Sequence, residues 1–210
     1  LVGSEMCIRD RIRDETGVTL SDLNLGGGYG VRYTQEDEAI DIPARLAELA
    51  AYLKEKTERL GLPMPRFLME PGRSIVADAG MTLYTVGSVK RIPGYKQYAA
   101  VDGGMTDNPR YALYQSRYTV YHAHKSGSME RFDVVGRCCE SGDIIQPGVE
   151  LPGDTCRGDL LAVCTTGAYN YSMASNYNRL PRPAVVMLTP DRIYEAVRRE
   201  TFADLTALDL

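Results

Sequence analysis

Two adjacent cysteines, Cys138 and Cys139, are followed by Glu140 and, after a Ser-Gly pair, by Asp143. A thiol beside a carboxylate could hold a metal ion, form a redox pair, attack an electrophile or donate a proton. The segment could equally be a charged turn at the edge of the core. The five cysteines show no C-x-x-C spacing, which argues against a zinc site and a disulfide framework. No histidine lies nearby in the sequence, so Cys–His nucleophilic chemistry is weakly supported and a proton-donating thiol stays open.

The composition excludes several other classes of function. The two histidines, His122 and His124, alternate as strand or loop residues do, so we expect both at the surface and predict no metal site. A net charge of -4 over 210 residues gives no basic surface for nucleic acid. No apolar run approaches the roughly 20 residues that span a bilayer. Free thiols fit a reducing, cytoplasmic setting.

Three glycines, Gly26, Gly27 and Gly28, follow a short apolar run at residues 22–25. Backbone N–H groups without a Cβ nearby can cradle a phosphate at the end of a strand. The segment is neither a Walker loop nor a dinucleotide fingerprint, because no Lys-Ser/Thr pair follows and Val31 replaces the third glycine. A tight turn without a ligand explains these glycines equally well.

A second polar turn, MEPGRS at residues 69–74, follows another short strand. Residues at the carboxyl ends of parallel barrel strands point into the mouth of an active site. Glu70 and Arg73 could there orient a charged ligand. The alternative is a surface turn with a Glu–Arg ion pair.

Two further segments could bind a carboxylate or line a cleft. Arg110 and Tyr114 lie four residues apart and would share one face of a helical turn. The segment GAYNYSMASNYN at 167–178 places Tyr169 and other polar residues just after an apolar strand. Taken alone, a solvated loop explains the first segment better, and an ordinary hairpin explains the second equally well.

The elements that must position these residues fall into two regions. Residues 22–25, 41–61 and 66–70 predict a strand, a helix and a strand, with Asp41 as the cap, Pro43 in the first turn and Gly61 at the end. Strand, helix and strand make a βαβ unit with parallel pairing. Beyond residue 82, short β-branched runs between Pro-Gly and Gly-Gly turns predict a mostly antiparallel β-domain, and Thr201 begins a short terminal helix.

These segments, taken in order, closely resemble the diaminopimelate decarboxylase family, within the fold-type III pyridoxal-phosphate decarboxylases. The resemblance extends from about residue 12 to the end and rests on LNLGGGYG, EPGRSIVADAG, AVDGGMTDNPRYALY, VVGRCCESGD, GDLLAV and GAYNYSMASNYNRLPRPA. The segments ESGD and PRYALY are more similar to this family than to ornithine or arginine decarboxylases.

The resemblance implies a (β/α)8 barrel followed by a C-terminal β-domain, with pyridoxal 5'-phosphate bound at the barrel mouth. It implies that Gly28, Glu70, Pro71, Gly72, Arg73 and Tyr169 contact the cofactor. It implies that the substrate, meso-2,6-diaminopimelate, is held by Arg73, Arg110, Tyr114, Glu140 and Tyr169.

The resemblance also gives the opening cysteines a role. It implies that Cys139 protonates the carbon from which CO2 leaves, while Cys138 packs and Asp143 anchors the turn. In this family, the cysteine and the glutamate reach the active site of the other subunit of a homodimer. Two alternatives remain, a decarboxylase of another basic amino acid or carboxylated polyamine, and a non-catalytic β-domain that dimerises or binds an anion.

The chain is shorter than the family pattern, because a whole barrel takes about 200 residues or more. We expect a C-terminal fragment, with the last part of the barrel at residues 12–85 and the β-domain at 86–210. The family's Schiff-base lysine is missing, because no lysine here matches its motif, so this chain alone should be inactive. Residues 1–11 lack the layout of a secretory signal and resemble translated adapter sequence, which suggests a non-native leader.

Overall fold

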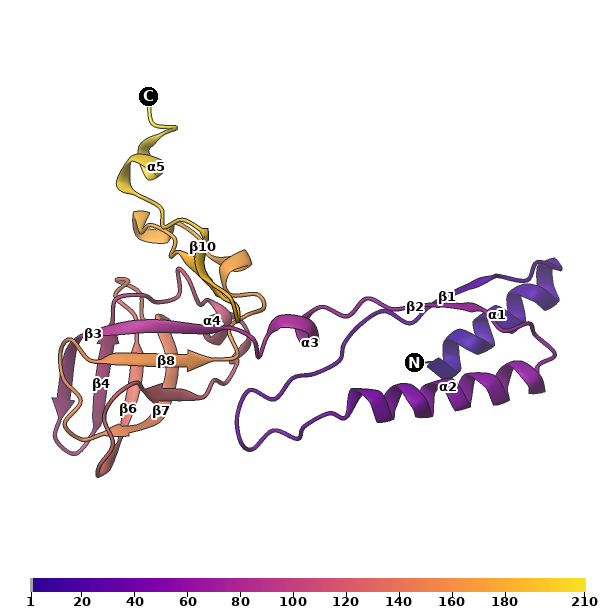
Figure 1. Cartoon of the computed structure of the whole chain (residues 1–210), viewed down its shortest axis with the longest axis horizontal. Helices are drawn as coiled ribbons and strands as arrows, with labels where there is room; N and C mark the ends of the chain where they lie inside the picture. Colours follow the sequence, from indigo (N-terminus) through magenta and orange to yellow (C-terminus); the bar gives the residue numbers. More distant parts are fainter. Residues whose placement is uncertain (1) are drawn as a thin grey trace. The chain divides into compact units, whose positions relative to one another are not determined.

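The computed structural model describes residues 2–210, and the side chains of residues 7–210. The chain folds into two compact units, each with its own core (Figure 1). The N-terminal unit comprises the residues up to Val31 together with Glu38–Ile75. The C-terminal unit comprises Arg32–Asp37 and Val76–Leu210. No helix in the described part of the chain is long and apolar enough to cross a membrane.

The N-terminal unit contains the predicted strand, helix and strand. β1 (Asp22–Asn24) pairs in parallel with β2 (Arg66–Leu68), and α2 (Ile42–Arg59) connects them. Asp41 accepts a hydrogen bond from the Ala44 N–H at 3.0 Å, and Gly61 takes a positive φ of 61° just beyond the helix. These caps are the ones that the sequence predicted.

The core of this unit forms where one face of α2 meets the strands. Leu23, Leu53 and Leu62 are buried, with Leu25, Leu49, Tyr52, Leu60 and Phe67 packed around them. The preceding helix, α1 (Val2–Thr16), contributes a buried Arg9, which is 2% exposed. Its guanidinium donates to the carbonyls of Leu20 and Pro63, each at 2.9 Å. Burial lowers the pKa of Arg9 from its ordinary value.

The C-terminal unit is built on a six-stranded mixed sheet in the order β5-β8-β3-β4-β6-β7. Every neighbouring pair is antiparallel except β4 with β6. The Tyr118 N–H, just before β5, donates to the Gln146 side chain on β7 at 2.8 Å, so the sheet nearly closes as a barrel. The strands are β3 (Met81–Ile92), β4 (Lys96–Val101), β5 (Val120–His122), β6 (Met129–Val135), β7 (Ile144–Pro152) and β8 (Leu160–Cys164).

Inward-facing residues of this sheet form the larger core. Phe132, Val134, Ile145, Leu161 and Val163 are all fully buried in it. Alternate residues along each strand face outward, which explains why Met81 and Leu83 are exposed while Tyr84 and Val86 are buried.

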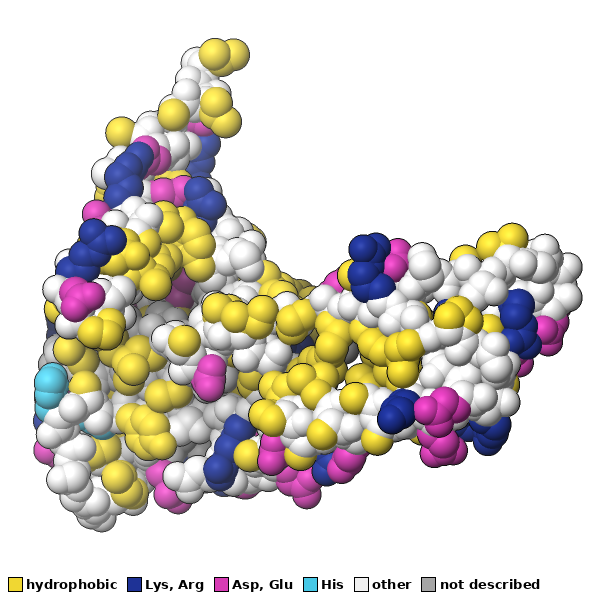
Figure 2. Space-filling model, turned by 45° about the vertical axis from the view of Figure 1, so that its right-hand side comes forward, with side chains coloured by type: hydrophobic (Ala, Val, Ile, Leu, Met, Phe, Trp, Pro, Cys, Tyr) yellow, Lys and Arg dark blue, Asp and Glu magenta, His cyan; other side chains and the backbone are white. Residues whose placement is uncertain are grey.

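Smaller elements complete the chain. β9 (Val185–Leu188) and β10 (Ile193–Val197) form an antiparallel hairpin, and α5 (Phe202–Thr206) follows it. Thr201 and Asp204 make the predicted capping box at the start of α5. Apolar side chains remain exposed on the hairpin, and yellow patches mark such side chains over the surface in Figure 2.

The prediction that His122 lies at the surface is wrong, whereas His124 is exposed as expected. The His122 side chain is only 3% exposed, and its Nε2 lies 3.1 Å from Asp159 Oδ2. Its Nδ1 accepts the N–H groups of His124 and Lys125. The chain turns back over the imidazole at the end of β5, and this turn was not visible in the alternating pattern.

The packing of the N-terminal unit predicts that Leu53→Ala destabilises the chain by about 2–5 kcal/mol, because it opens a cavity at a site that is 1% exposed. Urea unfolding of the two proteins measures this loss. The matched control is Lys54→Ala, an exposed neighbour, which should change stability by less than about 0.5 kcal/mol. Equal effects of the two substitutions would show that this core does not form.

Candidate functional site

Arg110 is the central cation of the C-terminal unit. It begins the short helix α4 (Arg110–Tyr114) and is only 6% exposed. Its guanidinium carbon lies 5.5 Å from the centre of the Tyr114 ring and 5.4 Å from that of Tyr169. Arg110 and Tyr114 therefore share a helical face as predicted, and Tyr169 joins them from a distant part of the chain.

Tyr169 is held in place by a strained turn after β8. Thr165 and Tyr169 both adopt positive φ, 60° and 66°, a region that costs a non-glycine residue about 1–3 kcal/mol. Gly167 lies so close to Val76 that an added Cβ would come within 1.9 Å of the Val76 carbonyl oxygen. The Gly167 N–H donates to the Ala77 carbonyl at 3.0 Å, so only glycine permits this crossing.

Asp143 holds the loop that carries the two cysteines. It is 4% exposed, and its two carboxylate oxygens accept the N–H groups of Met105 and Cys138, each at 2.6 Å. Its own backbone carbonyl accepts the Gly136 N–H at 2.9 Å. The predicted anchoring of the turn by Asp143 is therefore confirmed, and the same carboxylate also fixes the loop after β4.

The two cysteines differ in environment. Cys138 is half-buried beside Asp143, and burial together with that carboxylate raises the pKa of its thiol to about 11. Cys139 is exposed. This difference agrees with a packing role for Cys138 and leaves Cys139 accessible to a reacting group.

Glu140 is exposed at the tip of this loop. Its carboxylate accepts the Gly142 N–H and the Ser141 hydroxyl, each at 3.2 Å. The bond from Gly142, together with those from Ser141 and the Tyr177 hydroxyl, lowers the pKa of Glu140, so it is ionised at neutral pH. In the described part of the chain, no hydrogen bond or ion pair joins Cys139 or Glu140 to Arg110. These predicted site residues are therefore not bonded to one another within the described chain.

The glycine turn and the Glu70 turn meet in the N-terminal unit. The Glu70 N–H donates to the Gly26 carbonyl at 2.7 Å, and an added Cβ on Gly27 would lie 2.2 Å from the Glu70 carbonyl oxygen. Gly28 has a φ of 90° and open space where a Cβ would be. Pro71 and Gly72 are exposed, and Arg73 begins α3 (Arg73–Val76). The predicted phosphate cradle and the adjoining Glu-Pro-Gly-Arg turn are thus neighbours.

Two polar residues around these sites were not predicted from the sequence. Asn24 donates to the Glu70 carboxylate at 2.6 Å and accepts the Gly26 N–H at 2.8 Å, so it joins the two turns. Ser116 accepts a hydrogen bond from Arg110 at 3.3 Å. Asn24 is the polar residue before the glycines, and that position is a signal that could have identified it.

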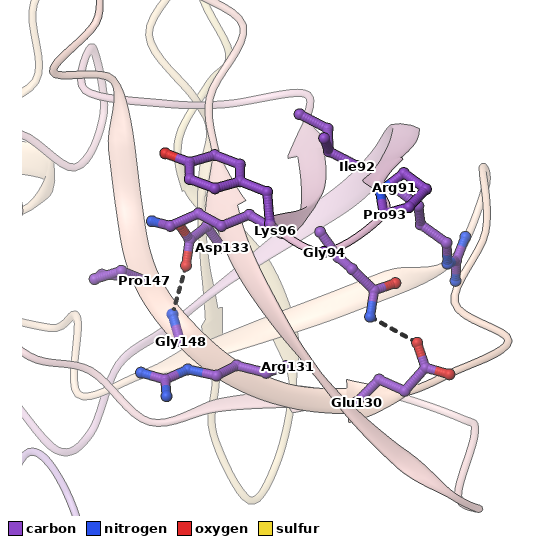
Figure 3. A pocket seen from close by; sticks show the side chains of 12 residues that line it. Arg91, Ile92, Pro93, Gly94, Lys96, Glu130, Arg131, Asp133, Pro147 and Gly148 are labelled. Atoms are coloured by element: carbon purple, nitrogen blue, oxygen red, sulfur yellow. Dashed lines mark hydrogen bonds and ion pairs between the residues drawn. The ribbon is translucent and has the colours of Figure 1, made fainter.

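An open pocket with a volume of about 880 Å³ lies elsewhere, beside the β3–β4 turn (Figure 3). Three of its charged groups already have partners, because Lys96 Nζ lies 2.6 Å from Asp133 and Gln97 donates to Glu130 at 2.7 Å. None of the predicted site residues lines it. Among the residues that the structure describes, no group of three or more His, Cys, Asp or Glu side chains could hold a metal ion.

Residues 13–167 match the family model of the pyridoxal-dependent decarboxylase C-terminal sheet domain. The chain belongs to this decarboxylase family. It is 48% identical to diaminopimelate decarboxylase of Bacillus subtilis (strain 168) over 203 residues, which are 96% of this chain and 46% of that protein. The chain thus spans about half the length of the curated relative that it matches.

Solved structures of decarboxylases have the same fold. The structure of diaminopimelate decarboxylase from M. jannaschii in co-complex with L-lysine superposes with a TM-score of 0.87 and 33% identity, covering 98% of this chain and 46% of that one. The structure of lysine/ornithine decarboxylase from Vibrio vulnificus, complexed with cadaverine, superposes with a TM-score of 0.70 and 27% sequence identity. The match covers 84% of this chain and 46% of that one.

The environment of Cys138 predicts slow alkylation at pH 8 and a rate that rises as the pH approaches about 11, because the thiolate is the nucleophile. Iodoacetamide labelling followed by fragmentation mass spectrometry measures this rate at each cysteine. Exposed Cys156 is the internal control, and circular dichroism over the same pH range checks that the fold persists. Equal labelling of Cys138 and Cys156 at pH 8 would contradict the described environment.

Proposed function

We propose that this chain acts in a pyridoxal-phosphate-dependent decarboxylase that converts meso-2,6-diaminopimelate to L-lysine and CO2, the last step of lysine biosynthesis. The environment of Arg110 is the main support for this proposal. Its guanidinium is nearly buried, and no carboxylate in the described chain pairs with it. A buried cation without an anionic partner favours an anionic ligand strongly.

The distal end of diaminopimelate provides that anion. It carries a carboxylate and an ammonium, whereas lysine and ornithine carry only an amine at the same end. Arg110, supported by Tyr114 and Tyr169, holds the carboxylate, and Arg73 assists. Glu140, whose pKa is lowered, holds the ammonium. A site built for both charges rejects substrates that leave one of its groups unpaired.

Cys139 and Glu140 reach the active site of a second subunit in this proposal. The support is their exposure on a loop that Asp143 anchors, and the absence of a link to Arg110 within the described chain. The Cys139 thiol then donates its proton to the carbon that has lost CO2. The protein is accordingly a homodimer, and its free thiols agree with a cytoplasmic location.

The residues near β1 and β2 fit the phosphate of pyridoxal phosphate. The N–H groups of Gly27 and Gly28 donate no hydrogen bond to a protein acceptor in the described chain, and Gly28 has open space where a Cβ would be. The turn from Glu70 through Pro71 and Gly72 to Arg73 lies along the same cradle, and Tyr169 contacts cofactor and substrate. When bound, the cofactor supplies the electron sink for the electron pair released with CO2.

In this proposal, the two regions of the chain belong to two domains of the whole enzyme. Residues 12–85 form the last part of a (β/α)8 barrel, supported by the parallel β1–β2 pair and the helix between them. Residues 86–210 form the C-terminal β-domain.

A related decarboxylase of another basic amino acid or of a carboxylated polyamine is the second candidate. The fold shared with lysine/ornithine decarboxylase favours it, although with a TM-score of 0.70 against 0.87. Arg110 distinguishes the two, because a substrate without a distal carboxylate leaves that buried cation without an anionic partner.

The experiment expresses the whole reading frame that contains these codons and measures CO2 release from meso-diaminopimelate, lysine and ornithine. We expect release from diaminopimelate and little from the others. Arg110→Met should raise the KM for diaminopimelate about tenfold or more, since hydrogen bonds to charged groups contribute about 1.5–3 kcal/mol. The exposed Arg45→Met is the control, and the 210-residue chain alone should be inactive. Faster release from lysine or ornithine would refute the assigned substrate.

A further inference from the structure

A group of buried polar side chains lies in the C-terminal unit around Arg110. Asn108 is 1% exposed, and Tyr118 and Asn170 are each 4% exposed. Asn108 precedes α4 by two residues, Tyr118 precedes β5, and Asn170 follows Tyr169 directly. None of these three was identified from the sequence, and none touches solvent appreciably.

The Tyr118 hydroxyl lies beside Arg110 and Asn170. Burial raises its pKa, while the charge of Arg110 and polar contacts with Arg110 and Asn170 oppose that rise. The Tyr118 backbone is fixed by Gln146, and its ring packs edge-on against Tyr33 with 5.5 Å between ring centres. The hydroxyl is therefore held at a defined place next to the guanidinium.

These groups do not reach full hydrogen-bond geometry within the described chain. The Arg110 Nε, the Tyr118 hydroxyl and both amide atoms of Asn108 and Asn170 have no partner at hydrogen-bond geometry. Buried polar groups in folded proteins are nearly always bonded. Donors and acceptors are present here in the complementary types that one hydrogen-bonded network requires.

Such a network would fix the orientation of the Arg110 guanidinium within its own plane, which the tyrosine rings do not fix. Tyr114 and Tyr169 contact the guanidinium as aromatic rings, which leaves its rotation within its own plane unrestrained. Only hydrogen bonds from the guanidinium N–H groups restrain that rotation. The hydrogen bond to Ser116 is one such bond, and it is long at 3.3 Å. A carboxylate bound by two parallel N–H groups needs this angle to be fixed.

We propose that Tyr118 and Asn170 are positioning residues that fix the orientation of the Arg110 guanidinium and thereby set the preference for a substrate with a distal carboxylate. The inference rests on the proposed function for its substrate. It concerns residues that do not touch the substrate and act only through Arg110.

The test compares Tyr118→Phe, Asn170→Leu and the double variant in the product of the whole reading frame. Each single variant should raise the KM for meso-diaminopimelate about five- to tenfold and change kcat less than twofold, because hydrogen bonds to a charged group are lost. The double variant should raise the KM by less than the product of the two single increases, because both residues act through one network.

The matched control is Thr155→Val, which removes another buried hydroxyl, bonded to the Pro152 carbonyl at 2.6 Å. It should lower the melting temperature without changing KM. If the Tyr118 and Asn170 variants also lower only the melting temperature, their role is structural and the inference is overturned.

A second readout separates this inference from the proposed function. In nitrogen-15 spectra, the Arg110 Nε–H should exchange slowly with solvent in the parent protein and faster in Tyr118→Phe and Asn170→Leu. If the parent protein does not decarboxylate diaminopimelate, the proposed function fails, and this exchange rate still decides the inference. Unchanged exchange in both variants would overturn it.

Discussion

The burial of one positive charge constrains the functional region of this chain. Arg110 is 6% exposed, and removing a guanidinium from water costs free energy that a protein recovers only through partners. The two tyrosine rings recover part of it, since a desolvated cation–π contact contributes about 2 kcal/mol. The Ser116 hydroxyl adds one long hydrogen bond, and an anion is the partner that would recover most of the remainder, which connects the fold of the C-terminal unit to the charge of a ligand.

The sheet of the C-terminal unit holds in place the loops that surround Arg110. Asp143 bonds the loop after β4 to the loop after β6, so α4 and the cysteine segment are tied to the same carboxylate. The close approach of Gly167 to Val76 fixes the strained turn that presents Tyr169. Rigid strands with functional residues on anchored loops are a common arrangement in enzymes.

Local patterns in the sequence predicted those elements whose signals are themselves local. Asp41, Pro43 and Gly61 identified the ends of α2, and Thr201 identified the start of α5. The contact of Arg110 with Tyr114 followed from helical spacing. The parallel pairing of β4 with β6 could not be predicted, because it depends on the closure of the whole sheet.

The buried polar groups were also beyond prediction from the sequence. His122 was placed at the surface because nothing local indicates that the chain turns back over its ring. Tyr118 and Asn170 lie more than fifty positions apart, and only the folded chain brings Asn170 to Tyr118 and Tyr118 to Arg110. Arg32–Asp37 belongs to the C-terminal unit although the residues on either side of it belong to the N-terminal unit. This assignment also depends on a contact between distant positions, because Thr119 donates to the Tyr33 carbonyl at 2.9 Å.

The most direct test is a crystal structure of the whole protein with bound pimelate, a dicarboxylate of the same chain length as diaminopimelate. The account predicts a terminal carboxylate on the Arg110 guanidinium with N···O distances of about 2.7–2.9 Å. It also predicts Glu140 of the partner subunit within reach of the same end. A structure in which a protein carboxylate pairs with Arg110, and pimelate binds elsewhere, would contradict it.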